Sequence, residues 1–151
     1  MLELFKVGKD DISMLSEMLS RCFADSYLPD GLNPATESTT AIFHSNNSKN
    51  MSAYIAIENN EAVGVIRLSA SDSTVRILDL AVEPEYRSRG IGSRMLTKLL
   101  SIYDSCDQWY VQVVAQDDRA MNFYILNGFA ATDAITEIDE DLYFVELVLV
   151  R

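Results

Sequence analysis

The feature that most constrains the fold is an apolar segment that leads through a short loop into an amphipathic helix. Residues 77–82 are almost continuously apolar, which predicts a strand buried on both faces. Pro84 ends this strand, because proline has no N–H for a sheet ladder. After Gly90, apolar residues recur at helical spacing over residues 91–103. The sequence therefore predicts a strand–loop–helix unit inside an α/β domain.

The rest of the chain alternates between strand and helix patterns. Apolar residues at helical spacing and favourable ends predict further helices at 12–23, 35–44 and 119–126. Further strands are predicted at 2–7, 51–58, 62–70, 109–114 and 142–150. The expected fold class is α/β with a mixed (α+β) sheet. Antiparallel N-terminal strands are followed by β-α-β-α-β, with about four helices in total.

Length and charge restrict the classes of function. A chain of 151 residues predicts one domain that spans residues 1–151. Twelve basic and 23 acidic residues leave a net charge of −11, which argues against binding to nucleic-acid phosphates. An acidic surface attracts cationic partners such as amines. The alternative is that the negative charge only serves solubility.

The cysteine content and the hydropathy of the chain bear on metal binding and on the expected location. Cys22 and Cys106 form neither a disulfide framework nor a metal-binding motif, so we expect no metal. We also expect no membrane association, because no apolar run reaches about 18 residues. The N-terminal residues lack a basic region followed by a cleavage site, so we expect a cytoplasmic protein.

The loop between the buried strand and the helix has the features of a phosphate site. A helix N-terminus offers unpaired N–H groups and partial positive charge, and glycines let the backbone approach an anion closely. Three basic residues add positive charge in an acidic chain: Arg87, Arg89 and Arg94. The P-loop motif is absent, and Met95 replaces the third glycine of the dinucleotide-binding pattern. The alternative is an ordinary strand–helix turn that uses glycine.

Two blocks in this region resemble one known family. Residues 87–92, RSRGIG, match the pattern [RQ]-x-x-G-x-[GA], and residues 120–129, AMNFYILNGF, match A-x-x-F-Y-x-x-x-G-F. Together they resemble the GNAT N-acetyltransferase superfamily. The resemblance implies a GNAT-like fold and an enzyme that transfers the acetyl group of acetyl-CoA to a primary amine. The amine would belong to a small molecule or to a peptide.

The resemblance also implies a set of cofactor-binding residues. The loop would hold the pyrophosphate through the backbone of Arg87, Ser88, Arg89, Gly90, Ile91 and Gly92, assisted by Ser93 or Arg94. The preceding strand carries a bulge in the family, which places the following residues beside the thioester: Leu80, Ala81 and Val82. A cofactor-binding asparagine of the family is replaced here by Asp117, and Asn122 is the residue that could compensate.

Three residues are the candidates for catalysis. Tyr124 occupies the family's general-acid position, and a phenol with a pKa near 10 can protonate a departing thiolate; the alternative is a core tyrosine. Asp79 and Glu83 are the carboxylates nearest to the site. Burial would raise the pKa of Asp79, although it could equally be a hydrogen-bonded structural residue. For Glu83 we favour a solvated loop carboxylate. The positions where relatives carry a base hold Arg76, Leu78 and Gln112.

The acceptor would bind, by the same resemblance, to residues 25–50 and 131–142. The second segment holds five acidic residues that could attract a polyamine, an aminoglycoside or a basic peptide: Asp133, Glu137, Asp139, Glu140 and Asp141. The alternative is a solvated turn. Two other functions stay open: acetylation of a protein N-terminus, and an acyl-CoA-binding sensor or interaction module without turnover. A homodimer that forms through the last strand is a further expectation.

Overall fold

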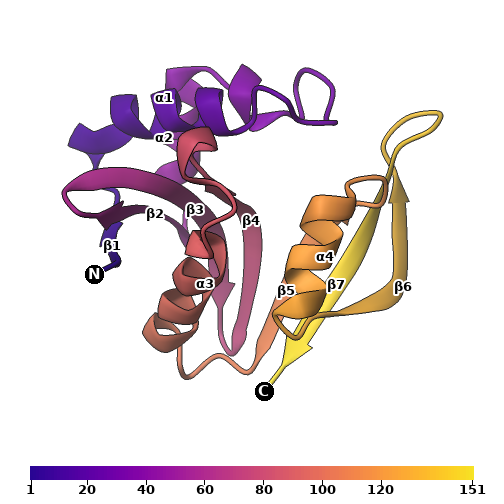
Figure 1. Cartoon of the computed structure of the whole chain (residues 1–151). Coiled ribbons are helices and arrows are strands. Elements are labelled where there is room, and N and C mark those ends of the chain that lie inside the picture. Colours follow the sequence, from indigo (N-terminus) through magenta and orange to yellow (C-terminus); the bar gives the residue numbers. More distant parts are fainter.

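A seven-stranded sheet and four α-helices make up the computed structural model, which describes residues 1–151 (Figure 1). The strand order is β1-β2-β3-β4-β5-β7-β6. The strands are β1 (Glu3–Lys6), β2 (Met51–Glu58), β3 (Glu61–Ser71), β4 (Thr74–Val82), β5 (Gln108–Val114), β6 (Ala130–Glu137) and β7 (Tyr143–Val150). The helices are α1 (Ile12–Cys22), α2 (Thr39–Asn46), α3 (Ile91–Ile102) and α4 (Asp118–Leu126). All neighbouring strands pair antiparallel except β4 and β5, which confirms the predicted mixed sheet.

Strand β6 is the element that the sequence patterns missed. Its residues, AATDAITE, show no apolar alternation, and all except Thr132 are exposed. A strand that buries neither face carries no periodic signal, because only burial selects apolar residues at every second position. Strand β7 consequently lies between β5 and β6 and is not at the edge. The free edges of the sheet belong to β1 and β6, so the last strand offers no edge to a second chain, and the homodimer itself stays a prediction.

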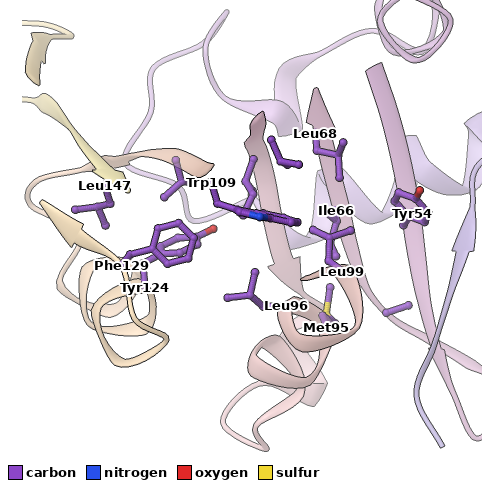
Figure 2. Close-up of a cluster of buried hydrophobic side chains, with 14 of the residues drawn as sticks. Tyr54, Ile66, Leu68, Met95, Leu96, Leu99, Trp109, Tyr124, Phe129 and Leu147 are labelled. Atoms are coloured by element: carbon purple, nitrogen blue, oxygen red, sulfur yellow. The ribbon is translucent and has the colours of Figure 1, made fainter. Parts of the chain in front are cut away.

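Two hydrophobic clusters hold the helices on opposite faces of the sheet. Helices α1 and α2 pack on strands β2 and β3 through one cluster, which includes the buried side chains of Leu15, Leu19 and Ile42. Helices α3 and α4 cover the other face through the larger cluster of Figure 2, in which Trp109 is fully buried. Each such apolar side chain contributes about 1.5–3 kcal/mol on burial. No helix is both long enough and apolar enough to cross a membrane.

The two central strands run side by side only at their beginnings. β4 pairs with β5 from Thr74 to Ile77, and beyond that point the strands diverge (Figure 1). Leu78 is an extra residue in the β3–β4 register and forms a bulge there. The predicted burial of residues 77–82 on both faces is therefore wrong for the end of β4. Leu78 is 43% exposed because β5 leaves its side at this point.

Candidate active site

The diverging ends of β4 and β5 enclose a continuous cleft. A larger cavity of about 690 Å³ lies beside the loop that precedes α3. A smaller cavity of about 230 Å³ lies beside the two strands. Both cavities are lined by Leu80 of β4, by Tyr124 of α4 and by Tyr27, which follows α1. A ligand in the larger cavity can therefore reach the smaller one next to Tyr124.

The loop between β4 and α3 presents a run of unused hydrogen-bond donors. After the 3-10 helix η3 (Pro84–Tyr86), Ser88 and Gly90 take left-handed conformations, with φ of 66° and 75°. The backbone N–H groups of residues 88–93 donate no hydrogen bond to any acceptor in the chain. Gly90 is the N-cap of α3 and no side chain caps it. A Cβ added to Gly90 would meet no atom within 4 Å, so the space in front of the loop is open.

These features suit the loop to binding an anion. The unpaired donors lie at the positive end of the α3 dipole, where an anion is stabilised by charge and by hydrogen bonds together. The successive N–H groups of the loop also form a concave backbone site of the kind that binds phosphate groups. The loop residues that line the larger cavity are Tyr86, Arg87, Ser88, Gly90, Ile91, Gly92 and Ser93.

The three guanidinium groups do not surround this site as free cations. Arg87 donates to the carbonyl oxygens of Val82 (3.2 Å) and Cys22 (2.8 Å) and lies 3.4 Å from a carboxylate oxygen of Asp25. Arg94 forms a two-point ion pair with Glu58 of β2, and Arg89 lies over the ring of Tyr86 at 5.5 Å. Arg87 and Arg94 thus find acceptors in this acidic chain and Arg89 contacts only a ring, so the backbone N–H groups are the main free donors that line the cavity.

Glu83 is buried, and the expectation of a solvated carboxylate is wrong. It is 5% exposed and accepts a hydrogen bond of 2.9 Å from Nε of Arg21, at the end of α1. The thiol of Cys22 lies 3.7 Å from its other oxygen, and burial together with the negative charge of Glu83 raises the pKa of Cys22 to about 12. Glu83 lines neither cavity. Through this hydrogen bond Glu83 connects the loop between β4 and α3 to Arg21, which lies 62 residues earlier in the sequence.

The end of β4 directs backbone groups into the cleft. The N–H of Glu83 donates to Val63 of β3 at 2.8 Å. Backbone groups alternate between the two edges of a strand, so the N–H groups of Leu80 and Val82 point away from β3 and toward the opening. The hydrogen bond from Arg87 to the Val82 carbonyl agrees with this direction. All three predicted thioester-side residues, Leu80, Ala81 and Val82, line the larger cavity.

Tyr124 is a buried phenol that borders both cavities. Its ring packs edge-on against Phe123 and Phe129, with centroids 5.0 and 5.3 Å apart (Figure 2). Its hydroxyl forms no hydrogen bond within the chain. The hydroxyl oxygen is nevertheless not fully buried, because it keeps some accessible surface. Burial, together with the negative charge of Asp79, raises the pKa of Tyr124 above its ordinary value. The group is therefore a protonated donor at neutral pH.

Asp79 faces the smaller cavity and also belongs to a buried ion network. Its carboxylate accepts a hydrogen bond of 2.6 Å from Nε of Arg67, which also holds Glu37 through two bonds. Burial raises the pKa of Asp79 above its usual range, although the Arg67 guanidinium acts in the opposite direction. Both predicted roles, base and structural hydrogen-bonded residue, are compatible with this position. Sequence reasoning missed Arg67 and Glu37; an arginine inside an apolar strand was the available signal.

The two remaining predicted cofactor contacts, Asp117 and Asn122, differ in their position relative to the cavities. Asp117 is the N-cap of α4, where it accepts a hydrogen bond from the N–H of Ala120, and it lines both cavities. Asn122 is exposed and lines neither cavity. Asn127 was missed, because its place before Gly128 only indicated a helix end. Its side-chain amide donates to the hydroxyl of Ser93 at 3.2 Å and connects α4 to the loop.

Fold and site together define a class of α/β protein in which two parallel strands separate beside a helix N-terminus with unpaired N–H groups. A match to the Acetyltransferase (GNAT) family spans residues 12–129, so the chain belongs to this family. This agrees with the resemblance of the two sequence blocks.

Solved structures with the same fold cover nearly the whole chain. The ribosomal-protein-S18-alanine N-acetyltransferase of Escherichia coli has a TM-score of 0.79 at 16% identity, covering 99% of this chain and 94% of that one. The PaiA N-acetyltransferase of Thermoplasma acidophilum, in complex with coenzyme A, has 0.75 at 20% identity, covering 97% and 98%. A mutant of the SpeG spermidine N-acetyltransferase of Vibrio cholerae has 0.76 at 11% identity, covering 99% and 93%.

One relative with a similar sequence is a much longer protein than this chain. The chain is 29% identical over 76 residues to a tRNA(Met) cytidine acetyltransferase of Saccharolobus islandicus. This match covers 50% of the chain and only 10% of that protein.

Proposed function

We propose that the protein is an N-acetyltransferase that uses acetyl-CoA as cosubstrate and transfers the acetyl group to a primary amine. The observation that carries the proposal is the run of unpaired N–H groups over residues 88–93, which opens onto the larger cavity. Membership of the GNAT family supports it, and so does the coenzyme A complex of the T. acidophilum relative.

Coenzyme A would lie along the loop and the end of β4 in the larger cavity. The pyrophosphate would lie on the backbone of residues 88–93, where Gly90 leaves the approach open. One N–H group, of Leu80 or of Val82, would bind the pantetheine arm, and Asp117, Ala120 and Phe123 would form the opposite wall. Bound there, acetyl-CoA would supply the acetyl group as a thioester.

The transfer moves one proton from the amine to the sulfur. The nitrogen of the free amine forms a bond to the acetyl carbon, the carbon–sulfur bond breaks, and the proton that the nitrogen loses replaces the one that the thiolate gains to become a free thiol. One of the two N–H groups of Leu80 and Val82, the one not bonded to the pantetheine arm, is our candidate donor to the thioester carbonyl oxygen, and such a donor is worth roughly 3–4 kcal/mol. Tyr124 holds a proton on its phenolic oxygen for the leaving sulfur.

The amine must be deprotonated before it reacts. An amine with a pKa of about 10.4 is about 3.4 units from its free base at pH 7, which costs roughly 4.6 kcal/mol. Asp79 lines the smaller cavity, and burial raises its pKa, so it is our candidate to accept this proton directly or through water. The hydrogen bond to Arg67 limits its basicity. That bond favours the second candidate function, an acyl-CoA-binding sensor without turnover.

Two measurements test the proposal together. Titration calorimetry with coenzyme A should detect binding to the folded protein, and a panel of amines with acetyl-CoA should release free thiol. Binding without thiol release on any amine would favour the sensor. Absence of binding would remove both functions.

A further inference from the structure

The smaller cavity restricts which amine can react, if the proposed function holds. It encloses about 230 Å³, and 13 of its 18 lining residues are hydrophobic. Aromatic side chains from three parts of the chain contribute: Phe23 and Tyr27 around the end of α1, Tyr124 of α4 and Phe144 of β7. An acceptor that enters this space loses its water shell and gains mainly apolar and aromatic contacts.

Two of the three charged side chains of this cavity, Arg76 and Asp79, already have a partner of opposite charge. Arg76 lies 3.4 Å from Glu146 and over the ring of Tyr110 at 5.3 Å. Asp79 is bound to Arg67, and Asp117 caps α4. A second ammonium group on the acceptor would find only Asp117 as a carboxylate without a cationic partner, and elsewhere in the cavity it would be buried unpaired, which is costly. A carboxylate on the acceptor would meet the negative charge of Asp117, while the one cation of the lining, Arg76, is already paired with Glu146.

The acidic residues near the end of the chain do not change this. Asp133, Glu137 and Asp139 to Asp141 belong to β6 and the following turn, and none of them lines either cavity. Asp133 and Glu137 are exposed on the edge strand β6, where water and salt screen their charges. They could raise the local concentration of a cation but they do not bind one inside the cavity.

We propose that the acceptor is a compact primary amine with an apolar, aromatic body and no second charge, of the arylalkylamine type. This inference rests on the proposed N-acetyltransferase activity and refines its substrate class. The aromatic body lies among Phe23, Leu32, Val113 and Phe144, and the amine lies beside Asp79 and Tyr124. Spermidine, the substrate that names a structural relative, has the wrong charge pattern for this cavity.

Thiol release from acetyl-CoA with four acceptors tests the substrate class. The panel is phenethylamine, spermidine, L-phenylalanine and a short peptide with an N-terminal alanine. We expect kcat/KM for phenethylamine to exceed the other three by roughly tenfold or more, the discrimination that an apolar pocket provides. A higher kcat/KM for any other member overturns the inference but leaves the acetyltransferase activity in place. Coenzyme A binding with no thiol release on any member overturns the proposed function and this inference with it.

Variants of the cavity wall link the preference to these residues. Phe144→Ala should lower kcat/KM for phenethylamine by roughly tenfold while the Kd for coenzyme A stays unchanged. Leu78→Ala is the second variant, since Leu78 is 43% exposed and its truncation disturbs the core less. Phe43→Ala on α2, outside both cavities, is the matched control and should leave the acceptor kinetics unchanged. Unaltered kinetics in both wall variants would also overturn the inference.

Discussion

Tyr124 combines burial with a free hydroxyl. The ring is held between Phe123 and Phe129, while the hydroxyl has no partner in the chain. We expect Tyr124→Phe to lower kcat by roughly 10²–10⁴, the range for loss of a general acid. The Kd for coenzyme A and the melting temperature should change little, because no hydrogen bond within the protein is lost. Steady-state kinetics and calorimetry check this, and an unchanged kcat would remove Tyr124 from the mechanism.

The raised pKa of Asp79 predicts how the reaction rate falls at acid pH. Burial raises its pKa, so a reaction that needs its ionised form slows as pH falls through a value above the ordinary 3.9 or so for Asp. The rate is therefore retained above this raised pKa and lost below it. Asp79→Asn should lower kcat/KM and remove this limb from the pH–rate profile. If the variant keeps both rate and limb, Asp79 has only the structural role that its bond to Arg67 suggests.

The two thiols are protected in the folded protein. Cys22 and Cys106 are both buried, and burial together with the charge of Glu83 raises the pKa of Cys22 to about 12, so its thiol stays protonated at pH 8. We expect neither thiol to react within minutes with a disulfide reagent in the native state, and both to react in guanidinium chloride. The colour yield of the reagent measures this. Fast native labelling would contradict the buried position of Cys22 beside Glu83.

At the scale of elements, the loop before α3 depends on the conformation of Gly90. Its φ of 75° is strained for alanine by about 1–2 kcal/mol, and Gly90 lines the cavity proposed for the pyrophosphate, where an added methyl group would compete with the ligand for space. We expect Gly90→Ala to fold with a slightly lower melting temperature and to bind coenzyme A at least roughly tenfold more weakly.

Gly31 provides the matched control for this variant. Its φ of 92° is also left-handed, its Cβ would also meet nothing within 4 Å, and it lines neither cavity. Gly31→Ala should lower the melting temperature to a similar extent and leave the Kd for coenzyme A unchanged. Equal Kd values for the two variants in calorimetry would contradict the assignment of the loop as the cofactor site.

At the scale of the whole molecule, the central parallel pairing between two half-sheets is short. β4 and β5 pair over four residues each, and the cleft separates their remaining length. A ligand bound only to the folded state stabilises it, by about 2.7 kcal/mol at a concentration 100 times its Kd. We expect coenzyme A to raise the melting temperature by several degrees, and Gly90→Ala to need more ligand for the same shift. A melting curve unaffected by saturating coenzyme A would argue against binding across the cleft.

The sequence by itself determined the fold class, the family and the central strand–loop–helix unit. Local features carry these results: apolar periodicity in α3, a proline after β4, glycines in the loop, and two short blocks that include Tyr124. Only the tertiary structure decided where β4 and β5 separate, that β6 is a strand, and that Glu83 is buried against Arg21. These features depend on contacts between residues far apart in the chain, and local patterns carry no signal for partners that meet only after folding.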